Sequence, residues 1–88
     1  MYKNRTETGR NNLSGIRIAA MRKARVPRMA QRALADALQL QGMDLDKNAI
    51  QRIESGQRFV TDLELAAFAR VFGVRADALL HERAPEQG

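Results

Sequence analysis

The residue types that enzymes use most often for covalent or acid–base chemistry are scarce in this chain. Its 88 residues include no cysteine and a single histidine, His81. No serine, cysteine or metal-ligating side chain lies near His81 at a spacing that would serve catalysis. Since no nucleophile, base and orienting group can be assembled from the sequence, we expect no enzyme. We also expect no disulfide, metal or cofactor.

Polar side chains with hydrogen-bonding groups are instead concentrated in one short segment. They are Lys47, Asn48, Gln51 and Arg52. In the major groove of DNA, Arg and Lys side chains bond guanine, while Asn and Gln side chains bond adenine. The four residues are therefore suited to reading base edges, although on an arbitrary short helix they would more often be a solvated face.

The charge balance points to a polyanionic partner. The chain carries 15 Lys and Arg against 10 Asp and Glu, a net charge of +5, which favours nucleic acid. Most of the excess lies in residues 1–28. The longest apolar stretches are far shorter than the ~20 residues that span a bilayer, and the N-terminus lacks a signal-peptide core. We therefore expect a cytoplasmic protein that does not contact membranes.

The spacing of apolar residues predicts an all-α fold with five short helices, at about 13–25, 29–41, 46–55, 61–73 and 76–80. Asp44 or Asp46 would cap the third helix, and Thr61 with Glu64 forms a capping box for the fourth. The helices make one domain over 13–82, after a flexible basic arm at 1–12 and before a frayed tail at 83–88.

The order of these motifs resembles the helix-turn-helix domain of the phage Cro and C1 repressor family, also called the XRE family. The matching residues are Gln31-x-x-Leu34-Ala35, then Ile50-Gln51-Arg52-Ile53-Glu54-Ser55-Gly56, then Val71-Phe72-Gly73-Val74 and Asp77-x-Leu79-Leu80. The resemblance covers roughly residues 16–81 and implies a compact, five-helix, lambda-repressor-like fold. It also implies that the helix at about 46–55 enters the major groove.

The main departure from the family pattern lies between the second and third helices. The interval from Gln31 to Ile50 is about five residues longer than in the family, so the turn around 39–46 is elongated. Leu40, Met43 and Leu45 are apolar, and we expect them to anchor this turn against the core.

The resemblance also implies roles for single residues. It places Lys47, Asn48 and Arg52 at base contacts, with Gln51 beside them and Ala49 against a thymine methyl. Gln31 would touch the DNA backbone and brace the third helix. The expected backbone contacts further include Arg28, Gln57 and Arg58, and the expected structural ion pair joins Glu54 to Arg22, or to Arg25 if the register differs. Lys3, Arg5 and Arg10 of the arm either lie on phosphates or belong to a solvated terminus.

These observations predict a sequence-specific regulator of transcription that binds double-stranded DNA as a repressor. A homodimer on a partly palindromic operator is expected, joined through apolar residues near the C-terminus such as Val74, Leu79 and Leu80. Two alternatives remain open. One is a DNA-binding antitoxin with a protein partner, and the other is a helix-turn-helix fold used only for protein interaction.

Overall fold

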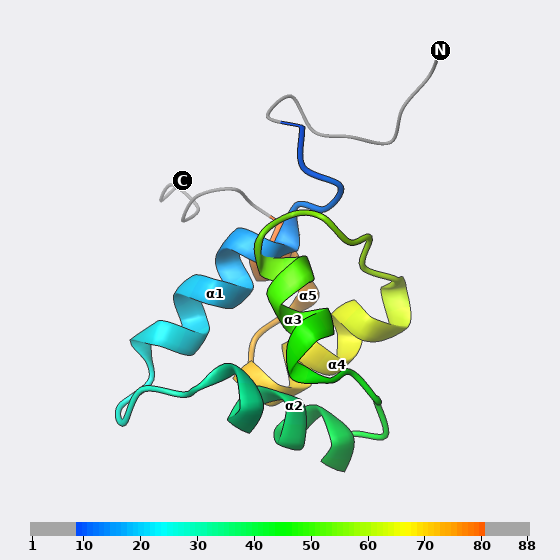
Figure 1. Ribbon diagram of the computed structural model, residues 1–88. Helices are drawn as coiled ribbons and strands as arrows, with labels where there is room; N and C mark the ends of the chain where they lie inside the picture. Colours follow the sequence, from blue (N-terminus) through cyan, green and yellow to red (C-terminus); the bar gives the residue numbers. More distant parts are fainter. Residues whose placement is uncertain (1–8, 81–88) are drawn as a thin grey trace, which may run out of the picture.

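The five helices begin and end close to the predicted positions. The computed structural model describes residues 9–80, in which the helices are α1 Ser14–Ala24, α2 Gln31–Leu40, α3 Lys47–Glu54, α4 Asp62–Phe72 and α5 Ala76–Leu80 (Figure 1). This part of the chain contains no strand, so the all-α prediction is confirmed. None of the helices in this part is long and apolar enough to cross a membrane.

Side-chain caps explain where α3 and α4 begin. Oδ1 of Asp46 accepts a hydrogen bond from the amide of Ala49 at 2.8 Å, so Asp46, and not Asp44, caps α3. Thr61 and Glu64 form the predicted capping box, with each side chain accepting from the other residue's amide, at 3.2 and 3.0 Å. Such caps contribute about 1 kcal/mol each, and they are local enough to be visible in the sequence.

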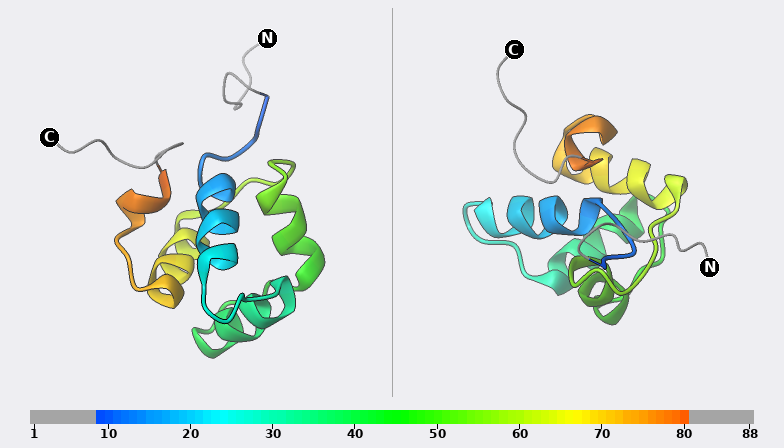
Figure 2. Two further views of the ribbon diagram at one scale, coloured as in Figure 1. Left: turned by 90° about the vertical axis from the view of Figure 1, so that its left-hand side faces the viewer. Right: turned by 90° about the horizontal axis from the view of Figure 1, so that it is seen from above.

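All five helices contribute to one core. Its largest fully buried apolar side chains are Ile18, Leu34, Leu38, Ile50, Ile53, Phe68 and Leu79. α1 packs against both α3 and α5, and α2 packs against α3 and α4. In Figure 2, α1 lies between α3 on one side and α5 on the other, with α2 crossing at one end. This arrangement leaves one side of α3 facing outward.

The elongated turn between α2 and α3 is confirmed and spans residues 41–46. Leu45 is buried and Met43 packs against the core, as expected of anchors. The same expectation for Leu40 is wrong, since that side chain is 89 % exposed. The inward positions of α2 are taken by Leu34 and Leu38, and the helical period turns Leu40 away from them.

The residues just before α1 correct the predicted arm. We call Arg10, Asn11 and Asn12 the N-terminal segment, and its last two residues bond the chain after α3. The amide of Asn11 donates to the carbonyl of Gly56 at 2.8 Å, and Asn12 is only 8 % exposed. These side chains hold the segment by hydrogen bonds to backbone carbonyls and not by apolar packing. The sequence therefore shows no apolar periodicity here, and the segment is predicted to be unstructured. Residues 1–8, with Lys3 and Arg5, and the tail from His81 onward lie outside the described residues.

α1 and the end of α3 approach each other closely at Gly15. A Cβ atom at this position would overlap the backbone carbonyl oxygen of Ile53 and lie 2.8 Å from Oδ1 of Asn12. Alanine is normally favoured over glycine inside a helix by about 1 kcal/mol. Here we expect Gly15→Ala to lower the free energy of unfolding by ~1–3 kcal/mol, because the backbone must shift.

Urea denaturation measures this effect, with Ala20→Gly on the exposed side of α1 as the matched control. The control should lose only the helix preference of about 1 kcal/mol. A Gly15→Ala protein as stable as the wild type would show that the two helices do not meet in this way.

Candidate nucleic-acid interface

α3 separates an apolar inner face from a polar outer face. Ala49, Ile50 and Ile53 are buried. The outer face consists of Lys47, Asn48, Gln51 and Arg52, all of them exposed. The expected contact of Ala49 with a thymine methyl is wrong, because this side chain is 8 % exposed and belongs to the core.

The four side chains of the outer face are available to a partner. Among residues 9–80, none of them makes a side-chain hydrogen bond or an ion pair. Together they present two cations and two amides on about two turns of helix. Amides both donate and accept hydrogen bonds, and the cations donate only. The outer face can therefore bond a surface that carries both kinds of group and negative charge.

Glu54, the last residue of α3, forms the predicted ion pair with Arg22 of α1. Nε and Nη2 of Arg22 donate to the two carboxylate oxygens at 2.8 and 2.9 Å. The side chains are 8 % and 9 % exposed. Arg25 is not the partner, because it donates to the carbonyl of Val71 and lies over the ring of Phe72 at the end of α4.

The same carboxylate is also bonded by the first residue of α2. Nε2 of Gln31 donates to Oε1 of Glu54 at 3.0 Å, which confirms that Gln31 braces α3. Nη1 of Arg22 in turn donates to the carbonyl of Met29 at 3.0 Å. One buried carboxylate thus connects α1, the start of α2 and the end of α3.

The loop after α3 differs from expectation. Arg58 donates from Nη1 and Nη2 to the two carboxylate oxygens of Glu64, at 2.9 and 3.0 Å. The hydrogen bond between them raises the pKa of Arg58 and lowers the pKa of Glu64. The amide of Gln57 donates to the carbonyl of Arg52 at 2.8 Å. Since these groups are used within the fold, we no longer assign phosphate contacts to Gln57 and Arg58.

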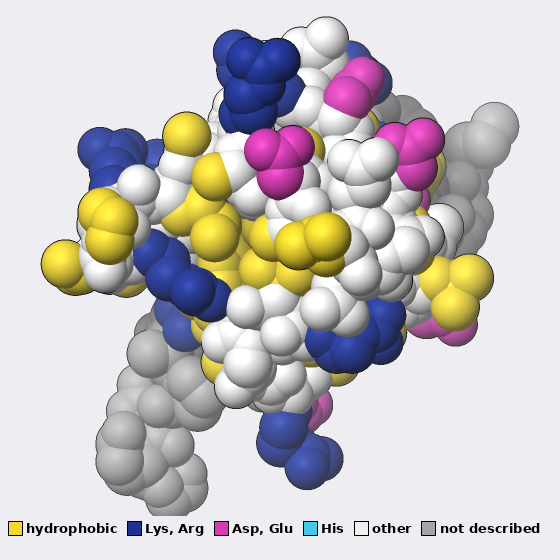
Figure 3. Space-filling view, turned by 90° about the horizontal axis from the view of Figure 1, so that it is seen from below, with side chains coloured by type: hydrophobic (Ala, Val, Ile, Leu, Met, Phe, Trp, Pro, Cys, Tyr) yellow, Lys and Arg dark blue, Asp and Glu magenta, His cyan; other side chains and the backbone are white. Residues whose placement is uncertain are grey.

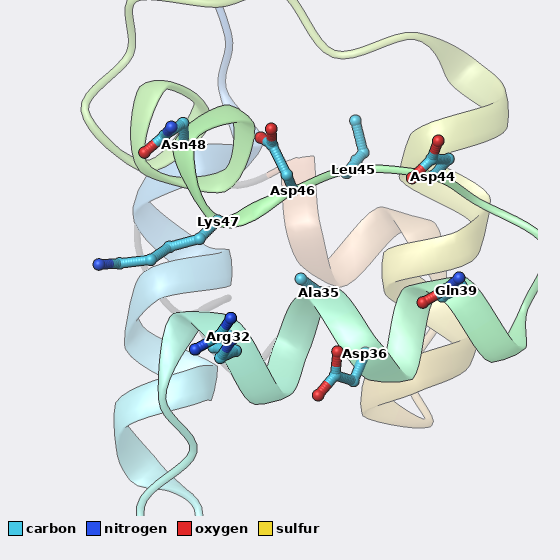
Figure 4. Close-up of a pocket in the computed structure, with 9 residues that line it drawn as sticks. All are labelled: Arg32, Ala35, Asp36, Gln39, Asp44, Leu45, Asp46, Lys47 and Asn48. Carbon is cyan, nitrogen blue, oxygen red and sulfur yellow. The ribbon is translucent and has the colours of Figure 1, made fainter.

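An open cleft of ≈ 500 Å³ lies between α2 and the elongated turn, beside the start of α3 (Figure 4). In the close-up, Arg32 and Lys47 lie at one end, whereas Gln39 and Asp44 lie toward the other. Asp36 and Asp46 also line it. A DNA backbone is repelled by these carboxylates and attracted by the two cations. The charges therefore favour approach of a polyanion at the end marked by Arg32 and Lys47.

The charges around α2 are mixed on a larger scale as well. Figure 3 shows the molecule from below, the side on which α2 lies. Apolar side chains gather at the centre of this face, and Lys and Arg side chains stand at several places around them. Acidic side chains are visible toward the edge nearest α3. Arg28, which precedes α2, is exposed, as a phosphate contact requires.

Comparisons with known proteins identify no relative: no family model matches the chain, and no curated protein or solved structure matches it significantly. The arrangement of α1–α5 is consistent with a small all-α helix-turn-helix domain. Any functional assignment therefore depends on the geometry of α3 and of the residues that hold it. Sequence reasoning found the outer face and the Glu54 pair, but it missed the N-terminal segment.

We expect Arg22 and Glu54 to be strongly coupled in stability. Glu54→Gln keeps the shape of the side chain but leaves a buried guanidinium without a counter-charge, at a cost of about 3 kcal/mol. Arg22→Met likewise leaves the buried carboxylate of Glu54 without a counter-charge. The double variant should lose clearly less than the two single losses combined, as measured by thermal unfolding of all four proteins. Additive losses would contradict the pairing.

The lowered pKa of Glu64 predicts a pH-dependent contribution to stability. The folded state favours the ionised form of Glu64 more than the unfolded state does. The contribution of this carboxylate to stability is therefore complete above the unfolded pKa of about 4.5, and it decreases as the pH falls below that value. Glu64→Gln keeps an acceptor for the capping box. The stability difference between wild type and variant should thus be largest near neutral pH and shrink toward pH ~3. A difference independent of pH would contradict an ion pair with Arg58.

Proposed function

We propose that the protein is a sequence-specific regulator of transcription that binds double-stranded DNA and reads the major groove with α3. The observation that carries this proposal is the outer face: four exposed hydrogen-bonding side chains on a helix whose opposite side is buried. None of the four has a partner among residues 9–80. The net charge of +5 supports a polyanionic ligand.

The dimensions of the helix suit this role. The eight residues of α3 span about 12 Å at ~1.5 Å per residue, and the major groove admits one helix. In the proposed complex, Lys47 and Arg52 bond guanine, and Asn48 and Gln51 bond adenine. Gln31 and Arg28, at and before the start of α2, contact phosphates. Arg32 at the cleft joins them as a new candidate.

We further propose that two copies bind a partly palindromic operator and repress by occupying it. The predicted surface for pairing needs correction, because Leu79 is fully buried and Val74 packs against the core. Leu80 is 41 % exposed, and with Leu13 it lines a small cleft between the start of α1 and the end of α5. This surface replaces the one predicted from the sequence.

Selection of bound duplexes from a random DNA pool tests the proposal with the full 88-residue chain. We expect enrichment of one motif with two half-sites whose centres lie ~10 base pairs, or a multiple of that, apart. Affinity should fall steeply with salt concentration. A folded protein that enriches no sequence would contradict the proposal and favour a protein-interaction module. A single asymmetric site would contradict only the dimer.

Truncating side chains of the outer face should weaken binding to the selected duplex more than binding to random DNA. Arg52→Ala and Asn48→Ala should each weaken binding to the selected duplex by ~1–3 kcal/mol and change binding to random DNA little. Arg75→Ala, at an exposed position before α5, controls for the loss of one positive charge. Fluorescence anisotropy on both duplexes measures the effect, and equal losses on the two would reassign the residue to phosphate contacts.

A further inference from the structure

The last turn of α3 is held from a second direction, by the N-terminal segment. Nη2 of Arg10 donates to the carbonyl oxygens of Glu54 at 2.8 Å and of Ile53 at 3.4 Å. The last carbonyls of a helix have no donor within it. The guanidinium therefore satisfies the carbonyl of Glu54, which would otherwise need water, and its charge lies at the negative end of the helix dipole.

Asn12 links three parts of the chain through one buried amide. Its Oδ1 accepts from the amide of Gly15 at 2.8 Å, in the first turn of α1. Its Nδ2 donates to the carbonyl of Ile53 at 3.0 Å and to that of Arg58 at 2.7 Å. The start of α1, the end of α3 and the loop after α3 are thus joined by a single side chain.

The backbone makes room for this arrangement at Gly56. This residue has a φ of 87°, a backbone conformation that residues other than glycine rarely adopt. A Cβ atom there would lie 2.8 Å from Cζ of Arg10. The side chain of Arg10 therefore lies in space beside Gly56 that a Cβ atom at this position would crowd.

We propose that Arg10 and Asn12 are positioning residues for DNA reading. This inference rests on the function proposed above and adds residues outside the helix-turn-helix itself. The Glu54 carboxylate is held by α1 and α2, and the carbonyls of the same turn are held by the N-terminal segment. Two sets of bonds from different directions stop α3 from pivoting about a single anchor.

A rotation of α3 about its last turn would move the side chains at the opposite end of the helix the most. Lys47 and Glu54 are the first and last residues of α3, about 10 Å apart along its axis at ~1.5 Å per residue. A small rotation at Glu54 therefore displaces Lys47 and Asn48 from the base edges. Hydrogen bonds weaken steeply with such misalignment, whereas a phosphate attracts a cation with little regard to angle.

This difference separates a positioning role from a phosphate contact by Arg10. We would measure the affinity of Arg10→Met for the selected duplex and for a random duplex over a range of salt concentrations. A positioning role predicts a loss of about tenfold or more on the selected duplex. Binding to the random duplex and the salt slope should change no more than in Arg75→Met, which removes an exposed charge elsewhere. Arg10→Lys, which keeps a charged donor, should recover part of the affinity.

Two results with Arg10→Met would overturn the proposal. One is an equal loss on both duplexes together with a salt slope shallower by ~0.9, which would make Arg10 a phosphate contact. The other is an Arg10→Met protein with unchanged affinity for both. If Arg10→Met does not fold, as judged by circular dichroism, Arg10→Gln replaces it. That change keeps an amide donor but removes the guanidinium that bonds the carbonyls of Ile53 and Glu54, and it should lower the preference for the selected duplex in the same direction; an unchanged preference would also overturn the proposal.

The experiment also distinguishes failure of this inference from failure of the proposed function. If the wild-type protein selects a DNA sequence and the Arg10 variants retain that selectivity, only the positioning role is wrong. If the wild type selects none, the proposed function fails. In that case hydrogen exchange still tests the physical basis, because Arg10→Met should speed exchange of the α3 amides relative to those of α4. Equal exchange in both helices would then overturn the positioning role as well.

Discussion

The architecture depends on one buried carboxylate. Glu54 receives two hydrogen bonds from Arg22 and one from Gln31, and it thereby joins three helices at a single point. Removing both charges from water costs free energy that their attraction offsets only in good geometry. The pair is therefore better understood as a device that selects one arrangement of α1, α2 and α3 than as a large source of stability.

Burial of Glu54 also resolves an electrostatic conflict. In the proposed complex, an acid at the end of α3 would repel the phosphates of DNA, but Glu54 is neutralised by Arg22 and shielded from solvent. Asp36, Asp44 and Asp46 are exposed around the cleft at the other end of α3. In the proposed complex with DNA, these exposed carboxylates would penalise an incorrect approach of the DNA backbone and so favour one binding mode.

The sequence predicts features with local causes better than those that depend on distant contacts. Helix ends are set by neighbours in the chain, such as the capping box of Thr61 and Glu64, and these were predicted correctly. The N-terminal segment was missed because its partners lie more than 40 residues away and its bonds are polar, so no apolar period reveals them. The exposure of Leu40 and the burial of Ala49 likewise depend on how α2 and α3 turn against the core. The Glu54 pair was found only through the resemblance to a family.

Because α3 is short, its stability depends on the N-terminal segment, and this dependence bears on how the domain unfolds locally. Isolated helices shorter than ~12 residues are barely populated in water, so α3, with eight residues, owes its helical state to its surroundings. A brief detachment of Asn12 would release the end of α3 and the start of α1 together. Local opening of this kind precedes global unfolding in many proteins. Proteolysis near residue 10 would therefore loosen the last turn of α3, while the bonds of Glu54 and the buried side chains of Ile50 and Ile53 still held the helix to the core.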